Sequence, residues 1–439
     1  MYNKAILKRL RQIVHQAQIR QDLDTAQNPD LQRAIKIVET FLRKSKRVCY
    51  GGQAINVQLP QKDQFYNLET SLPDYDFFSP DDKEDTRALI EDLKAAGFTE
   101  ITKRVGIHEG TTKIYINYVA IADITKIDEG FYEQINRKSI AVDGIQYADP
   151  VFLRMMMFLE LSRPRGMLSR WEKVYERLEL LDKAHPLKTC TSTTRNLAVT
   201  ESREAAVARG AVLRYIIRNH RVFMGADISS LYKSGTASSR TKFLLHGRSP
   251  VVFFSPDASL DADALVVDLK AAKGEITGFQ NILPAMIGLY RDEELVCLVV
   301  QEEACHSFIS IPLTKQRVLK VASLDTLLTF LIGLYYRDDH ILFGSDSLLC
   351  WLSEYMKLLE RYRAKPTALV PSFSIECSGY QTTFASLLRA KGARIEAERQ
   401  RIGSGIRSGR SGRSERSERP ATRKAFRNRL RKTRRLTNN

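Results

Sequence analysis

The stretch RVCYGGQAIN at residues 47–56 decides the fold, because it joins three kinds of local structure. RVCY is rich in the residue types of a short strand. Gly51 and Gly52 then permit a tight turn that residues with side chains would resist, and AINVQL continues as a helix. A helix that starts at a glycine turn leaves backbone N–H groups free to bind a phosphate. The stretch therefore predicts a strand–turn–helix unit that binds an anion.

The flanking sequence extends this unit into an α/β fold. Apolar residues recur at helical spacing over 3–20 and 30–46, ahead of the strand. Beyond the turn, LPDYDFFS at 72–79 is typical of a strand, and the following helix is expected to end at Gly97. TKIYINYVAIADIT at 112–125 indicates one strand or two.

The chain contains an internal repeat, which indicates two copies of one α/β unit. FFSPDDKEDTRALIEDLKAA resembles FFSPDASLDADALVVDLKAA at an offset of 176, and the two tryptophans of the chain occupy equivalent places. The matched segments are 77–96 with 253–272, 47–55 with 221–229, and 171–186 with 351–366. Three matched segments in the same order, at offsets between 174 and 180, are hard to obtain by chance.

The second copy lacks the polar residues of the first. The counterparts of Asp74, Asp76 and Gly52 are Pro250, Val252 and Ala226, and a weak alignment places Cys305 opposite Asp123. A copy that keeps its packing residues and loses its carboxylates is expected to have a structural or RNA-holding role.

The carboxylates Asp74, Asp76 and Asp123 form the candidate catalytic and metal-binding set. Alternate residues of a strand point to the same side, so Asp74 and Asp76 project together. Such a pair repels itself unless a cation shares it, and oxygen ligands suit Mg²⁺. Asp123 ends an apolar strand and can complete a two-metal site. A lone DxD or GlyGly is usually just a turn; the ordered combination is specific.

This ordered pattern resembles the DNA polymerase β-like nucleotidyltransferases. YGGQAIN at 50–56 and LPDYDFFS at 72–79 are similar to the catalytic subunit of poly(A) polymerases of large cytoplasmic DNA viruses, over about residues 47–125. The resemblance implies two tandem nucleotidyltransferase-like domains, the second degenerate. It implies that Asp74 and Asp76 ligate two Mg²⁺ or Mn²⁺ ions, that Asp123 ligates one of them, and that Gly51 and Gly52 hold the β- and γ-phosphates of ATP.

The same resemblance implies a reaction and its partners. AMP would pass from ATP to a single-stranded RNA 3′ end, contacted mainly through its backbone, during polyadenylation of viral mRNA. A homodimer or a viral processivity partner is implied, as is a place in the host cytoplasm at the viral factory, and in the virion. Two alternatives stay open: another terminal transferase that adds uridylate or CCA ends, and a catalytically silent RNA-binding scaffold.

Charge and composition suggest four segments. We expect an N-terminal helical segment at 1–46, the catalytic domain at 47–190, the degenerate domain at 191–390, and a disordered Arg-rich tail at 391–439. Residues 401–439 hold 14 Lys and Arg against two Glu, so the tail carries +12 of the net charge of +17. A basic tail favours binding to a phosphate-rich partner such as RNA. A nuclear-localisation or virion-packaging signal explains the same composition equally well.

The remaining features exclude some classes of protein. Six cysteines without paired spacing indicate neither a disulfide framework nor a zinc site, and buried thiols are expected. No apolar run reaches the length of a membrane span, so no membrane partner is expected. Lys113, Lys126 and Arg154 are cations that could face a pyrophosphate, but none is assigned, because a solvated side chain is the more frequent case.

Overall fold

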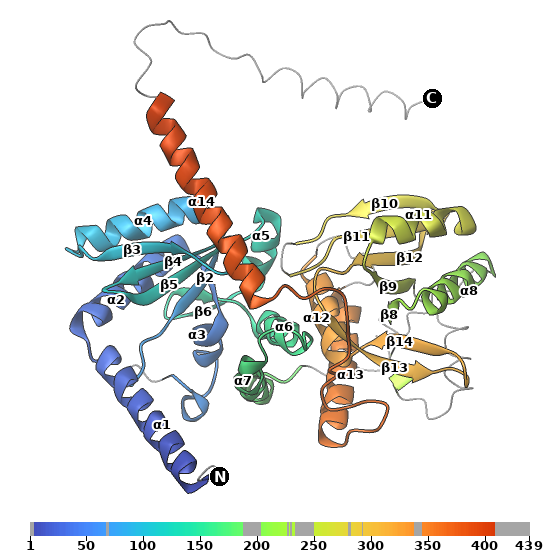
Figure 1. The fold of residues 1–439 in the computed structure, drawn as a ribbon, viewed down its shortest axis with the longest axis horizontal. Coiled ribbons are helices and arrows are strands. Elements are labelled where there is room, and N and C mark those ends of the chain that lie inside the picture. Colours follow the sequence, from blue (N-terminus) through green and yellow to red (C-terminus); the bar gives the residue numbers. More distant parts are fainter. Residues whose placement is uncertain are drawn as a thin grey trace, which may run out of the picture. The chain divides into compact units, whose positions relative to one another are not determined.

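The computed structural model describes residues 4–66, 70–187, 203–225, 228, 231–232, 250–279, 282–291, 293–337 and 345–408. The chain divides into a unit Met1–Leu388 and a unit Arg389–Asn439. The first unit contains two mixed sheets with helices packed on them (Figure 1). The expected α/β class is therefore confirmed, while the four segment boundaries stay a prediction.

Two helices precede the first sheet, as the sequence predicts. α1 (Lys4–Ala26) is exposed along most of its length, whereas α2 (Pro29–Ser45) buries one apolar face. The Asn28 side chain caps α2 by accepting hydrogen bonds from N–H groups of its first turn, and the C-cap residue Lys46, just after the helix, is left-handed at φ 54°. Both ends of α2 are therefore capped.

The first sheet has the strand order β3-β4-β5-β2-β1-β7-β6. The segment 112–125 forms two strands, and β3, β6 and β7 were not anticipated from the sequence. The elements of this half are β1 (Val48–Tyr50), α3 (Gly51–Asn56), β2 (Tyr75–Ser79), α4 (Asp82–Ala95), β3 (Ile101–Val105), β4 (Thr111–Ile116), β5 (Val119–Lys126), α5 (Glu129–Lys138), β6 (Ile140–Val142), β7 (Ile145–Tyr147), α6 (Pro150–Leu161) and α7 (Trp171–Ala184).

The two faces of this sheet have different neighbours. On one face Phe77 of β2 packs against Phe41 of α2, with ring centroids 5.9 Å apart. On the other face Phe78 meets Phe152 of α6 at 5.7 Å. Asp76 shares the face of Phe78, because alternate residues of a strand point the same way. The carboxylate therefore lies on the α6 side, away from α2.

The second sheet repeats the first strand by strand. Its order is β10-β11-β12-β9-β8-β14-β13-β15, so every strand of the first sheet has a counterpart. Its elements are α8 (Arg203–Arg218), β8 (Val222–Met224), β9 (Val251–Ser255), α11 (Ala258–Leu269), β10 (Ala272–Ile276), β11 (Met286–Arg291), β12 (Glu294–Gln301), β13 (His306–Pro312), β14 (Val318–Ala322), α12 (Leu324–Tyr335), α13 (Ser345–Ala364) and β15 (Cys377–Ser378).

A duplicated ion pair confirms the repeat at the level of side chains. Arg47 Nε lies 2.6 Å from a carboxylate oxygen of Asp85 on α4. Arg221 Nε lies 2.6 Å from Asp261, at the matching place on α11. Each pair ties the start of a central strand to the helix that covers the sheet. These residues belong to the packing that both copies kept.

The two copies share one continuous apolar core where α6 and α12 meet. Phe131 of α5 stacks on Phe279 at 4.2 Å. The Tyr336 hydroxyl donates a hydrogen bond to Asp149, the residue that caps α6. Neither copy is packed independently of the other.

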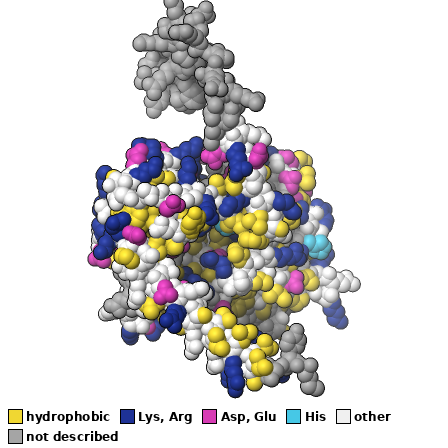
Figure 2. Space-filling view, turned by 60° about the vertical axis from the view of Figure 1, so that its left-hand side comes forward, with side chains coloured by type: hydrophobic (Ala, Val, Ile, Leu, Met, Phe, Trp, Pro, Cys, Tyr) yellow, Lys and Arg dark blue, Asp and Glu magenta, His cyan; other side chains and the backbone are white. Residues whose placement is uncertain are grey.

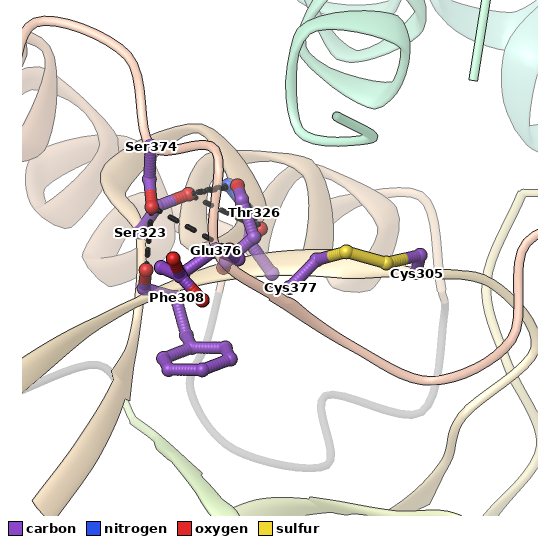
Figure 3. The surroundings of a disulfide bond; sticks show 8 residues. Cys305, Phe308, Ser323, Thr326, Ser374, Glu376 and Cys377 are labelled. Atoms are coloured by element: carbon purple, nitrogen blue, oxygen red, sulfur yellow. Dashed lines mark hydrogen bonds between the residues drawn. A yellow bond between two sulfur atoms is a disulfide. The ribbon is translucent and has the colours of Figure 1, made fainter. Parts of the chain in front are cut away.

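The bonding of the cysteines agrees only in part with the expectation of buried free thiols. Cys49 and Cys297 are buried free thiols, as predicted. Cys305 and Cys377, however, form a disulfide across a sequence separation of 72 residues (Figure 3). Antiparallel pairing of β15 with β13 places the two Cα atoms 5.3 Å apart. Spacing in the sequence could not reveal a pair made by such a long-range strand contact.

The start of the tail also differs from the expectation. α14 (Phe384–Ser408) is helical, so residues 391–408 correct the predicted disorder. Its Ala, Leu, Arg and Glu residues are strong helix formers, which outweighs the lack of an apolar face. Residues 409–439 lie outside the described residues. Among the helices that the structure describes, none is long and apolar enough to cross a membrane.

Candidate active site

The turn at Gly51 brings the backbone directly against a carboxylate. Gly51 has φ 75°, a conformation that residues with side chains rarely adopt. A Cβ atom built on it would lie 2.3 Å from Asp76 Oδ2. Glycine is therefore required here both for the backbone angle and for the close approach of Asp76.

Strand register gathers the three predicted aspartates. Asp76 of β2 is paired directly with Asp123 of β5, and on its other side with Tyr50 of β1. Asp74 stands just before β2 and is exposed at the surface, Asp76 is partly buried, and Asp123 is only 7% exposed. Asp74 and Asp123 both act electrostatically on Asp76. The structure thus places the three carboxylates together.

This arrangement makes ionisation of the carboxylates unfavourable. Reduced hydration raises the pKa of Asp76 well above its usual range, and the charges of Asp74 and Asp123 raise it further. The pKa of Asp74 rises to about 6, again through reduced hydration and then the charge of Asp123, although its side chain reaches the solvent. A site that resists losing its protons is one that a cation would stabilise.

Lys113 supplies a positive charge within the site. It is the partner of Asp123 across β4 and β5, and its ammonium donates a hydrogen bond to Asp123 Oδ2. Burial lowers the pKa of Lys113, but the hydrogen bond and charge of Asp123 outweigh burial and raise it. Asp123 Oδ1 is buried and has no hydrogen-bond partner. Among the described residues, no three His, Cys, Asp or Glu side chains stand in metal-ligand geometry.

Cations on α7 approach the second glycine of the turn. A Cβ atom on Gly52 would lie 2.8 Å from both Arg177 Nη1 and the Tyr66 hydroxyl. Arg177 donates a hydrogen bond of 2.7 Å to that hydroxyl. Lys173 lies one turn away on α7, and burial together with the charges of Arg177 and Arg170 lowers its pKa. Lys173 and Arg177 therefore lie on one face of α7, and Arg170 immediately precedes the helix.

The last residue of the YGGQAIN motif holds the loop that carries Tyr66. The Asn56 side-chain oxygen accepts hydrogen bonds of 2.8 Å and 2.9 Å from the N–H groups of Phe65 and Tyr66. Its amide donates to the Tyr66 carbonyl at 3.2 Å. The sequence analysis did not assign Asn56, Tyr66 or Arg177. Of these three residues, only Asn56 could have been singled out from the sequence, because it belongs to the YGGQAIN motif.

Two cations considered from the sequence do not join this cluster. Arg154 is buried on α6 and forms an ion pair with Asp182 of α7, so its role is packing. Lys126 is exposed at the end of β5. The short α3 also changes one expectation: its six residues provide little helix dipole. A phosphate at the turn would depend on the α7 cations instead.

The strands of the second sheet that the structure describes carry no equivalent set of carboxylates. In register terms the counterparts of Tyr50 and Asp76 are Met224 and Val252, and the counterpart of Asp123 is Leu298. The weak alignment of Cys305 with Asp123 is therefore wrong, because Cys305 lies beyond the end of β12. Ala226, the counterpart of Gly52, lies outside the described residues.

Part of the chain is similar to known viral proteins. Residues 36–167 match the family model "Poly(A) polymerase catalytic subunit". A protein of Acanthamoeba polyphaga mimivirus, provisionally named a poly(A) polymerase catalytic subunit, is 33% identical over 161 residues, which is 36% of this chain and 27% of that protein. An African swine fever virus protein with the same provisional name is 26% identical over 164 residues, 36% of this chain and 34% of its own.

The alignments thus span about a quarter to a third of the length of these relatives. The crystal structure of the Megavirus polyadenylate synthase superposes with a TM-score of 0.75, covering 91% of this chain and 84% of that one at 17% identity. At that identity the likeness establishes the fold, including the two-sheet architecture. The segment that carries the glycine turn and all three aspartates, residues 36–167, is thus the part of the chain that is similar to the poly(A) polymerase catalytic subunit family and to these two viral proteins.

Proposed function

We propose that this protein is a polynucleotide adenylyltransferase that transfers AMP from ATP to the 3′-hydroxyl of RNA. The observation that carries the proposal is the direct pairing of Asp76 with Asp123 beside the Gly51 turn. In the reaction the 3′-oxygen forms a bond to the α-phosphorus, the bond between the α-phosphorus and the bridging oxygen breaks, and pyrophosphate leaves.

The residues fit the divalent cations that this chemistry requires. All three candidate ligands, Asp74, Asp76 and Asp123, offer carboxylate oxygens, which Mg²⁺ and Mn²⁺ prefer. Asp123 Oδ1 is buried without a hydrogen-bond partner, so it is available as a ligand. When bound, such ions would lower the pKa of the attacking hydroxyl and neutralise the phosphates. We propose Asp74 and Asp76 as ligands of two ions and Asp123 as a ligand of one.

Residues of the chain itself would hold the triphosphate. Gly51 and Gly52 allow the phosphates to approach the backbone closely. Arg177 and Lys173 then supply positive charge beside Gly52, and Tyr66 fixes the direction of the Arg177 guanidinium by its hydrogen bond. Asp123 and Lys113 lie on the opposite side of Asp76. The nucleotide and the RNA end would thus approach Asp76 from opposite sides, as an in-line transfer needs.

The proposal includes the second substrate and the setting. The viral origin of the relatives supports a role in tailing viral transcripts in the host cytoplasm. The basic residues of 401–439 would raise the local concentration of RNA. A homodimer or a separate processivity subunit stays a prediction from the family resemblance.

A tailing assay tests the proposal. A labelled single-stranded RNA is incubated with Mg²⁺ and each nucleoside triphosphate in turn, and we expect extension with ATP. Preference for UTP or CTP would favour the uridylate or CCA alternatives, and no extension would favour the RNA-binding scaffold. Asp74→Ala and Asp76→Ala should abolish extension. Asp92→Ala, which removes an exposed carboxylate of α4, should leave it unchanged.

A further inference from the structure

One row of side chains crosses five strands of the first sheet and passes through the proposed site. Register pairs Tyr50 with Asp76 and Asp76 with Asp123. It then pairs Asp123 with Lys113, and Lys113 with Arg104 of the edge strand β3. Residues paired in this way stand side by side on one face of a sheet. Arg104 is thus the outermost member of the row that contains the catalytic aspartates.

The second copy has lost the complete row. Its five counterparts, taken from the same registers, are Met224, Val252, Leu298, Gly288 and Gly274. The ring of Tyr290 fills the vacated space, because Cβ atoms on Gly288 and Gly274 would lie 2.6 Å and 3.1 Å from it. The copy without carboxylates therefore also lacks the two outer cations. The fold does not require Arg104, since the second sheet forms without its counterpart.

Arg104 and Tyr115 form an exposed cationic and aromatic pair. The Arg104 guanidinium lies 4.8 Å from the centre of the Tyr115 ring. Arg104 is exposed, Tyr115 is partly exposed, and no described carboxylate forms an ion pair with Arg104. A register shift between Ile114 and Tyr115 sets the position of the ring, and the same shift precedes Tyr290 in the second copy. Figure 2 shows Lys and Arg side chains spread among hydrophobic ones over one face of the molecule.

The order of the row assigns this pair to one of the two substrates. Gly52 and Arg177 lie beside the glycine turn that follows β1, at one end of the row. Arg104 and Tyr115 lie at the other end, beyond Asp123. A polynucleotide needs a phosphate contact and a stacking surface upstream of its 3′ end, and a guanidinium beside an aromatic ring supplies both.

We infer that Arg104 and Tyr115 bind the RNA nucleotides immediately preceding the 3′ end, with Arg104 on a phosphate and Tyr115 stacked on a base. This inference rests on the proposed function. It makes Arg104 and Tyr115 positioning residues for the RNA primer and gives them no part in holding ATP.

Direct RNA binding tests the inference apart from catalysis. The full-length protein is titrated against a fluorescent oligoadenylate without ATP, and Arg104→Gln should weaken binding roughly tenfold. The slope of log affinity against log salt should fall by about 0.7, the value for one phosphate contact on a single strand. Lys103→Gln is the matched control, because it removes the same charge from the adjacent, exposed position on the opposite face of β3. It should change the affinity less than twofold.

Tyr115 provides the second arm. Tyr115→Leu should weaken binding about fivefold or more, while Tyr115→Phe, which keeps the ring, should restore it. In steady-state extension both Arg104→Gln and Tyr115→Leu should raise KM for RNA and leave KM for ATP unchanged. If the wild type extends RNA but Arg104→Gln and Lys103→Gln bind it equally well, the inference about Arg104 fails and the proposed function still stands. A raised KM for ATP would also overturn it. If the wild type neither binds nor extends RNA, the proposed function itself fails.

Discussion

At the scale of single residues, Gly51 offers a test that separates backbone strain from active-site geometry. Gly51→Ala imposes a side chain at φ 75° and 2.3 Å from Asp76 Oδ2. Gly97→Ala imposes a similar strain at φ 90°, with nothing within 4 Å of the new Cβ atom. Both should lose about 1–2 kcal/mol of stability. Only Gly51→Ala should lose extension activity, by about a hundredfold or more. Equal activities of the two variants would contradict the proposed role of the turn.

The raised pKa of Asp76 predicts that this carboxylate, when ionised, destabilises the folded protein. Because the folded state holds the proton more tightly than the unfolded chain, stability falls as pH rises above the usual carboxylate pKa of about 4. Asp76→Asn should therefore melt at a higher temperature than the wild type in EDTA, with a larger difference at pH 8 than at pH 5. Added Mg²⁺ should stabilise the wild type and narrow the difference. A lower melting temperature for Asp76→Asn at pH 8 would contradict this account.

At the scale of elements, helix α7 predicts a selective effect on the nucleotide. Arg177 lies beside Gly52, whereas Lys183, at the far end of the same helix, is 67% exposed. Arg177→Gln should raise KM for ATP roughly tenfold and leave RNA affinity unchanged, because a charged contact to the phosphates is lost. Lys183→Gln should behave as the wild type in both measurements. If Arg177→Gln weakened RNA binding and left KM for ATP unchanged, RNA and not ATP would bind beside the glycine turn, which would contradict this assignment.

The duplicated ion pair predicts acid sensitivity of the helix over the second sheet. Burial by itself would raise the pKa of Asp261, but hydrogen bonds from Arg221, Ser255 and Tyr215 outweigh it and the pKa is lowered. The stabilisation is therefore present above pH about 4 and lost as pH falls through the lowered pKa. At pH 7 Asp261→Asn should cost about 3 kcal/mol in urea unfolding, and the difference should narrow in acid. Asp263→Asn, 61% exposed, should cost about 0.5 kcal/mol or less.

The elements also show which parts of the structure the sequence could predict. The strand–turn–helix at 47–56, the gathering of Asp74, Asp76 and Asp123, and the repeat follow from local patterns and from strand periodicity. Arg177 and Tyr66 could not be found in this way, since only the folded chain brings α7 to the glycine turn. The Cys305–Cys377 bond depended on a strand pairing between distant segments, and Arg104 on the registers of four strand pairs. Long-range contacts leave no trace in local spacing.

At the scale of the whole molecule, the basic residues beyond α14 predict a salt-dependent contribution to RNA binding. Removing residues 409–439 deletes 12 Lys and Arg and two Glu, a net charge of +10. Truncation after Ser408 should weaken RNA binding at low salt and reduce its salt dependence, while extension at saturating RNA persists. An uncharged replacement of equal length is the control. If that replacement restored the affinity, charge would not be the cause.

The space taken by Tyr290 has a consequence for the history of the duplicated sheet. Once the ring had settled over Gly274 and Gly288, a lysine or arginine could return only if the ring moved first. Restoring aspartates at 252 and 298 would then place carboxylates in an apolar interior without a neighbouring cation, which is costly. Without the two outer cations the aspartates are costly to restore, and with the Tyr290 ring in place the cations cannot be restored. A single substitution therefore cannot rebuild in the second sheet the row of charged residues that the first sheet carries.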